Sequence, residues 1–145
     1  MIRFTVPGTP QGKARARTVY NPRIKRSVSY TPDNTILYEN LVKAMYLQEC
    51  QGEQYMDGQP LQAVIEAHFE PPKSVSKKKR AEMLEGLIKP CKKPDADNIA
   101  KVVLDALNGL AYKDDTQICS LTVQKEYREQ TGVEVYIYED RKAGE

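Results

Sequence analysis

The residues best suited to chemistry lie between positions 93 and 118 of the sequence. Asp95 and Asp97 flank a single alanine at the start of an amphipathic segment, and Asp114 and Asp115 follow that segment. Mg²⁺ prefers hard oxygen ligands, usually a few carboxylates completed by water and substrate phosphate. The pattern therefore predicts that Asp95, Asp97 and Asp115 bind one metal ion, with Asp114 as an accessory acid.

Lys101 follows Asp97 by one helical turn, so the two side chains are expected on the same helix face. Three neighbouring carboxylates would repel one another and raise each other's pKa, and a metal ion together with Lys101 would relieve that repulsion. Metal-assisted phosphodiester hydrolysis needs an ion that activates water and a cation near the developing charge. Asp95, Asp97, Lys101 and Asp115 are thus the predicted catalytic residues. Mg²⁺ is the predicted cofactor, and Mn²⁺ is an alternative.

The same residues also have purely structural explanations. Asp95 is a natural N-cap, Asp97 is favourable at the positive end of a helix, and Lys101 with Asp105 forms an ordinary i, i+4 pair. The later acidic pair could consist of turn residues. An isolated Asp-x-Asp pair is weak evidence, so the residue types alone leave both interpretations open.

Basic residues are concentrated in two blocks, although the net charge of the chain is only +2. Residues 1–32 contain seven basic residues and no acidic one, and residues 71–93 contain eight basic residues against two acidic ones. This asymmetry favours a polyanionic partner, although basic runs are also common on ordinary solvated surfaces. The predicted DNA-binding residues are Lys13, Arg15, Arg17, Lys77, Lys78, Lys79 and Arg80.

Composition restricts the other classes of chemistry. His68 is the only histidine, which excludes a histidine-pair metal site within one chain. Cys50, Cys91 and Cys119 form no Cys-x-x-Cys pair, so free thiols in a reducing compartment are expected. No segment has the length of a membrane span, and residues 1–6 are too short for the apolar core of a signal peptide. A cytoplasmic protein without a membrane partner is predicted.

The acidic segment resembles the RusA family of Holliday-junction endonucleases, which is common in phages and prophages. The family pattern reads P-D-x-D-N-x-x-K, then D-A-L, a short variable piece, and D-D-x-Q. Residues 94–101, 105–107 and 114–117 match it in order. Pro-Gly-Thr-Pro at residues 7–10, followed by basic residues, looks like the basic N-terminal loop of the family. The resemblance spans essentially the whole chain.

The resemblance implies a Mg²⁺-dependent, structure-selective endodeoxyribonuclease that acts in recombination and repair. It implies a homodimer that resolves four-way DNA junctions by paired symmetric nicks and leaves 5′-phosphate ends. It assigns Asp95, Asp97 and Asp115 to Mg²⁺, and Lys101 to phosphate or water activation. Three alternatives remain: a nuclease of other branched or flap DNA, a non-catalytic basic DNA-binding module, and a dimeric protein without a nucleic-acid partner.

Hydrophobic periodicity predicts the elements that position these residues. Strands are expected at residues 2–6, 61–69, 117–127 and 133–138. A first helix is expected from residue 32 to between residues 50 and 52, a second from a cap at Ser74 or Ser76 through Leu87, and a third at 95–108. The intervening segment of residues 7–29 lacks apolar periodicity, which predicts a long loop. The order predicts a single domain over residues 1–145 with an α/β two-layer fold, in which helices cover a mixed β-sheet.

Two packing expectations complete the sequence analysis. In the first helix, Leu37, Leu41, Ala44 and Met45 share one face, which predicts that this face is buried, with Thr31 as N-cap and Pro32 at the first helical position. The side chains of Tyr20, Tyr30 and Tyr46 are expected to pack against the protein rather than to stack on DNA bases.

Overall fold

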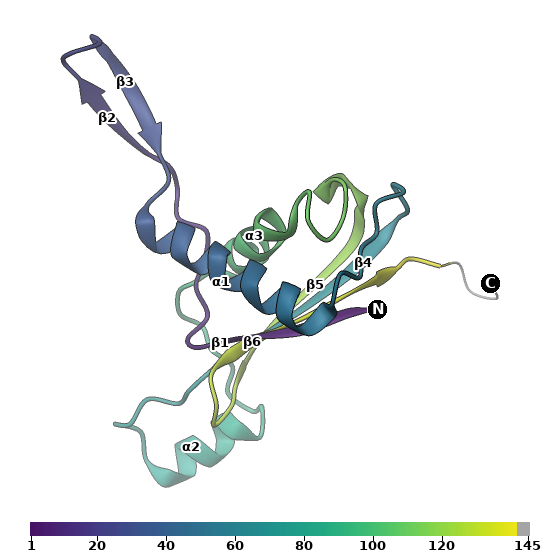
Figure 1. Ribbon diagram of the computed structural model, residues 1–145. Helices are drawn as coiled ribbons and strands as arrows, with labels where there is room; N and C mark the ends of the chain where they lie inside the picture. Colours follow the sequence, from purple (N-terminus) through teal and green to yellow (C-terminus); the bar gives the residue numbers. More distant parts are fainter. Residues whose placement is uncertain (142–145) are drawn as a thin grey trace.

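Alternating apolar residues build the central β-sheet of the computed structural model, which describes residues 1–141 (Figure 1). β1 (Ile2–Pro7), β4 (Leu61–Phe69), β5 (Ile118–Tyr127) and β6 (Gly132–Glu139) pair in the order β1-β6-β4-β5. β4 and β5 are parallel, and the other pairs are antiparallel. In β4 every odd-numbered residue is buried and every even-numbered one, including His68, is half-buried. One face of the sheet therefore carries the core.

Two helices form the second layer of the fold over that buried face (Figure 1). α1 (Asp33–Cys50) packs on β1 and on α3, and α3 (Ala96–Leu107) also contacts β5. Five apolar residues of α3 are almost completely buried: Ile99, Val102, Val103, Ala106 and Leu107. The structure confirms the predicted α/β two-layer fold with a mixed sheet. It also confirms that the segment after Asp95 forms an amphipathic helix.

The predicted long loop is wrong for its second half. β2 (Arg17–Asn21) and β3 (Arg26–Tyr30) pair as an antiparallel hairpin, here called the arm, that projects from the body of the molecule (Figure 1). Asn21 accepts a hydrogen bond from the Arg23 amide, and Lys25 adopts a left-handed conformation with φ of 52°. Hydrophobic periodicity could not predict these strands, because none of their residues is buried. A strand without a buried face needs no alternation of apolar and polar residues.

The predicted buried face of α1 is also wrong in part. Leu37 is 68% exposed, whereas Tyr38, Val42 and Tyr46 are buried and follow one another at i, i+4 spacing. The large apolar bodies of the two tyrosines take the core positions that the sequence analysis gave to aliphatic residues. Pro32, rather than Thr31, occupies the N-cap position, and no side chain caps this helix.

α2 (Lys77–Leu84) ends earlier than predicted. Ser76 is its N-cap and accepts a hydrogen bond from the Lys79 amide. Gly86, with a φ of 85°, turns the chain out of the helix, and Leu87 is left 72% exposed. The helix lies at the opposite end of the molecule from the arm (Figure 1).

Several remaining expectations can be compared with the described residues. The three cysteines are free, as predicted. Tyr46 packs in the core, but Tyr20 and Tyr30 are 60% and 46% exposed in the arm, so the expectation that they pack is wrong. Within residues 1–141, no helix is both long and apolar enough to cross a lipid bilayer. The last four residues of the expected domain, 142–145, lie outside the described part.

Candidate active site

The start of α3 presents two carboxylates that pair with no other side chain of residues 1–141. Asp95 occupies the N-cap position, but its side chain makes no capping hydrogen bond. Asp97 lies in the first turn of the helix, and both side chains are exposed. The N-terminus of a helix stabilises nearby negative charge, so both carboxylates are favoured as anions there. Because Asp95 does not cap the helix, its oxygens remain available to a ligand.

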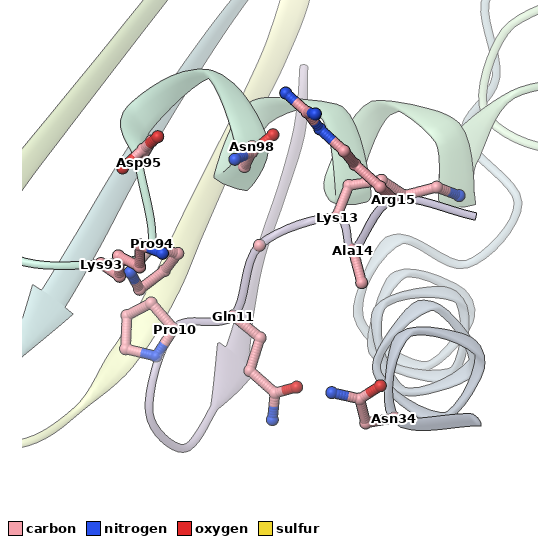
Figure 2. A pocket seen from close by; sticks show the side chains of 11 residues that line it. Pro10, Gln11, Lys13, Ala14, Arg15, Asn34, Lys93, Pro94, Asp95 and Asn98 are labelled. Carbon is pink, nitrogen blue, oxygen red and sulfur yellow. The ribbon is translucent and has the colours of Figure 1, made fainter. Parts of the chain in front are cut away.

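The loop between β1 and β2 lies across the start of α3 (Figure 2). The amide of Lys13 donates a hydrogen bond of 2.9 Å to the carbonyl of Asn98. Gly12 makes the closest approach, since a Cβ atom there would lie 2.9 Å from the Cβ atoms of both Asn98 and Pro94. Only glycine therefore permits this contact without displacement of the loop. The sequence analysis did not identify Gly12, because its neighbours come from a distant part of the chain.

Lys13 fastens the same loop to both helices. Its ammonium lies 2.5 Å from a Glu39 oxygen on α1 and 3.4 Å from an Asp105 oxygen on α3. Burial opposes the charge of Lys13, but its hydrogen bond to Glu39 and the charges of Glu39 and Asp105 outweigh that effect and raise its pKa. Asp105 thus pairs with Lys13 rather than with Lys101. The predicted DNA-binding residue Lys13 is a tether of the loop, and its ammonium is already paired.

α1 supplies further contacts to this loop that sequence reasoning missed. Thr35, one of two buried polar residues in the described chain, accepts a hydrogen bond of 3.3 Å from the Ala14 amide. Tyr38 is buried beside Gln11, and burial raises the pKa of its hydroxyl to about 12. The only sign of these contacts in the sequence is that a threonine and a tyrosine occupy positions on the buried face of α1.

Two adjoining clefts are formed between the loop and α3. The larger measures about 610 Å³ and is lined by residues that include Pro10, Arg15, Lys93, Asp95 and Asn98 (Figure 2). The second measures about 470 Å³ and is lined by residues 13–16 together with Asp97, Asn98 and Lys101. Lys101 is exposed and makes no ion pair with any described residue. The structure therefore brings the two carboxylates and the lysine together beside the basic loop.

Asp114 and Asp115 have different local roles. The Asp114 side chain accepts a hydrogen bond from the Thr116 amide and caps a short 3-10 helix, η1 (Asp115–Gln117), in a reciprocal capping box with Gln117. The hydrogen bond from Thr116 lowers the pKa of Asp114. The hydrogen bond and charge of Asp114 raise the pKa of Asp115, together with partial burial. Asp114 thus has a defined structural function as a cap, whereas Asp115 caps no helix and its half-buried carboxyl lies against Asp114.

Asp115 lies at the opposite end of α3 from Asp95 and Asp97. Its amide donates a hydrogen bond of 3.1 Å to the side chain of Asn108, the C-cap residue. The helical rise of 1.5 Å per residue separates Asp97 from Asn108 by about 16 Å along the axis. Among residues 1–141, no three His, Cys, Asp or Glu side chains lie close enough together to hold a metal ion. The predicted three-carboxylate cage is therefore not formed within this single chain.

Comparison with known proteins shows the family of this chain. A family model described as "Endodeoxyribonuclease RusA" matches residues 7–138, which include both clefts, all of α3 and the acidic pair after it. The chain belongs to the RusA endodeoxyribonuclease family. It is also 38% identical over 141 residues to "Uncharacterized protein YqaN" from Bacillus subtilis (strain 168), covering 95% of this chain and 96% of that protein.

The chemistry of the donors in this RusA family member fits a hard divalent cation in part. Asp95 and Asp97 offer carboxylate oxygens that accept no hydrogen bond from another side chain of the described residues, and they line clefts of about 610 Å³ and 470 Å³. Mg²⁺ usually takes one or two protein carboxylates and completes its shell with water and substrate oxygens. The pair at the start of α3 meets that requirement, whereas Asp115 is too distant to join it within one chain.

Apart from Lys13, the predicted DNA-binding residues lie at two separate ends of the molecule. Arg15 and Arg17 are exposed at the junction between the clefts and the arm. The first residues of α2, Lys77, Lys78 and Lys79, are exposed at the other end (Figure 1), and Arg80 is half-buried. Any DNA that contacts both groups must therefore extend across the molecule.

Proposed function

We propose that this protein resolves four-way DNA junctions by metal-dependent phosphodiester hydrolysis. One observation carries the proposal: within residues 1–141 the side chains of Asp95, Asp97 and Lys101 make no ion pair, and they line adjoining clefts next to an exposed arginine of the basic loop. Membership of the RusA family supports the same chemistry. A nuclease of this kind would meet its substrate in the cytoplasm.

Each residue of the site has a proposed task. Asp95 and Asp97 would hold Mg²⁺ or Mn²⁺ at the start of α3, where the helix dipole favours their negative charge. Such an ion would supply Lewis-acid polarisation of a phosphoryl oxygen and activation of water. Lys101 contacts the scissile phosphate or orients the attacking water, which stabilises the charge that develops in the transition state. The loop at residues 10–16 holds the DNA backbone against these groups, and cleavage leaves a 5′-phosphate end.

The exposed cations have a sequence-independent task in this scheme. Arg15 and Arg17 hold phosphates beside the site, and the lysines of α2 hold phosphates of a more distant segment. Each phosphate contact releases counterions, so the slope of log affinity against log salt falls by about 0.9 for every contact that is removed.

Replacing Arg15, Arg17, Lys77 and Lys78 by glutamine should therefore flatten the slope by up to about 3.6. An unchanged slope would place the DNA on another face.

Resolution of a junction by paired nicks requires two sites, and we propose that a homodimer supplies them. A closed two-fold dimer matches the two-fold symmetry of the substrate. It also accounts for the position of Asp115, because a site that is incomplete in one chain can be completed by Asp115 of the partner subunit.

The mixture of Asp97→Asn protein with Asp115→Asn protein tests this arrangement. Heterodimers regain one intact site if the residues come from different subunits, and both sites stay inactive if they come from one chain.

The decisive experiment measures nicking of an immobile four-way junction with and without Mg²⁺, with Asp97→Asn protein as control. We expect symmetric nicks that need the metal ion and vanish in the variant, while the variant still binds the junction. A parallel panel of flaps, three-way forks and linear duplexes defines the substrate class. Preferential cleavage of flaps would support a broader branched-DNA nuclease, and junction binding without any cleavage would support a non-catalytic DNA-binding module.

A further inference from the structure

The arm formed by β2 and β3 is the most exposed ordered part of the chain. From Arg15 to Tyr30 every residue except Asn21 is exposed, and the exposed side chains include Val19, Tyr20 and Val28. A two-stranded hairpin without a core is at best marginally stable in water. Exposed apolar residues on such a ribbon also contribute nothing to folding. Both features are typical of an element that completes its contacts on a partner.

The charge and the polar groups of the arm indicate the chemistry of that partner. The turn and the adjacent strand carry Arg23, Lys25 and Arg26, and no acidic residue occurs anywhere in residues 1–32. Cross-strand pairs share a face, and one face combines Thr18 with Ser29 and Tyr20 with Ser27. Four hydroxyl groups and three cations are the usual donors to phosphate and sugar oxygens. They suit the regularly spaced phosphate and sugar oxygens of a nucleic-acid backbone.

The arm is also connected directly to the candidate active site. Residues 13–16 line the cleft that contains Asp97 and Lys101, and β2 begins at the next residue, Arg17. Its five-residue strands extend for about 17 Å at 3.4 Å per residue. This length corresponds to about five base pairs of duplex. A two-stranded ribbon has the width that the major groove of B-DNA admits.

We propose that the arm lies in a groove of one duplex limb of the branched DNA, next to the strand held by the active site. The inference rests on the proposed action on branched DNA. It adds a second DNA-contact surface, the arm, which lies along the duplex limb and away from the cleavage point. The tip cations contact phosphates, and the hydroxyl face contacts sugars and phosphates along the groove. A second copy of this chain is the competing occupant, and the test below distinguishes it.

The test compares two variants that lose the same positive charge. The arm variant carries Arg23→Gln, Lys25→Asn and Arg26→Gln, where asparagine suits the left-handed conformation of position 25. The control variant carries glutamine in place of three other exposed cations, Lys43, Arg128 and Arg141. Hydroxyl-radical footprinting of an immobile four-way junction without added Mg²⁺, salt titration of binding, and sedimentation are measured for both variants and for the wild type.

The expected result is specific to the arm variant. It should lose a protected tract of about five base pairs on one limb, and its log–log salt slope should fall by up to about 2.7. The control should keep the tract. A second variant, in which Gly-Gly replaces residues 18–29 between the paired residues Arg17 and Tyr30, should lose the same tract. All variants should keep the wild-type melting temperature, because the arm contributes nothing to the core.

Three outcomes would overturn the inference. Equal footprints and slopes in the wild type and both arm variants, with normal junction cleavage, would overturn the role of the arm alone and leave the proposed function intact. Conversion of a wild-type dimer into monomers by either arm variant would identify a second copy as the occupant. Absence of junction binding and cleavage by the wild type would overturn both the proposed function and the role of the arm.

Discussion

Replacement of Gly12 by alanine tests whether the loop at residues 10–16 positions the active site. The new Cβ atom would lie 2.9 Å from the Cβ atoms of Asn98 and Pro94. Comfortable carbon–carbon contacts begin at about 3.5 Å, so the loop must retreat from α3 by about 0.6 Å or more. Gly12 has no positive φ, so alanine adds a clash but no backbone strain. The perturbation is therefore confined to the contact between the loop and the helix.

The expected effects on cleavage and on stability differ in size. A displacement of about 1 Å at reacting groups can lower a rate by about 100-fold, so we expect the rate to fall by about 10-fold to 100-fold. Overpacking of this kind costs about 1–3 kcal/mol of unfolding free energy, which a folded domain can tolerate. Single-turnover nicking of a four-way junction at saturating enzyme measures the rate, and urea denaturation measures the stability.

Gly52→Ala provides a matched control for the loss of stability. Gly52 follows α1, has a φ of 85° and has no neighbouring atom within 4 Å of a new Cβ. Alanine there costs about 1–2 kcal/mol through backbone strain, far from the loop. We expect its nicking rate to stay within about twofold of the wild type. Wild-type rates for Gly12→Ala would refute the positioning role of the loop, and equal rate losses in both variants would assign the effect to stability.

Further predictions concern the acidic residues and the lysine. Asp95→Asn, Asp97→Asn and Asp115→Asn should each abolish nicking but preserve junction binding in a gel shift, and normal nicking by one variant would remove that residue from the site. Lys101→Ala should keep its fold and slow single-turnover nicking by roughly 100-fold to 1,000-fold, since an aligned donor contributes ~3 kcal/mol or more. A decrease below fivefold would make Lys101 an ordinary surface residue. Asp114→Ala should cost about 1 kcal/mol of stability through the lost cap, and Asp114→Asn should restore it in the same melting experiment.

Local patterns in the sequence were sufficient to predict the sheet, α3 and the identity of the family. The apolar residues of α3 recur with helical period and are the residues buried in the structure. β4 alternates strictly and is buried on one face, as its sequence indicates. These predictions hold because a helix or strand that is buried on one face has apolar residues at a regular spacing along the sequence.

Long-range contacts decided how the candidate site is built. Lys13 was predicted to bind DNA, but Glu39 and Asp105 hold its ammonium and use it to tether the loop. Asp115 was predicted to complete a cage with Asp95 and Asp97, yet the length of α3 keeps it at the other end of the helix. Each of these outcomes depends on contacts between residues far apart in the chain, and a local sequence pattern cannot predict such contacts.

The amino-acid sequence by itself determined which residue types are available for chemistry, which segments alternate or repeat with helical period, and where positive charge is concentrated. Only the tertiary structure decided which of those charges are neutralised by partners, which carboxylates share a cleft, and that residues 17–30 form an exposed hairpin. The physical reason is that periodicity reports burial along one element. Ion pairing and the assembly of a site depend instead on how separate elements approach one another.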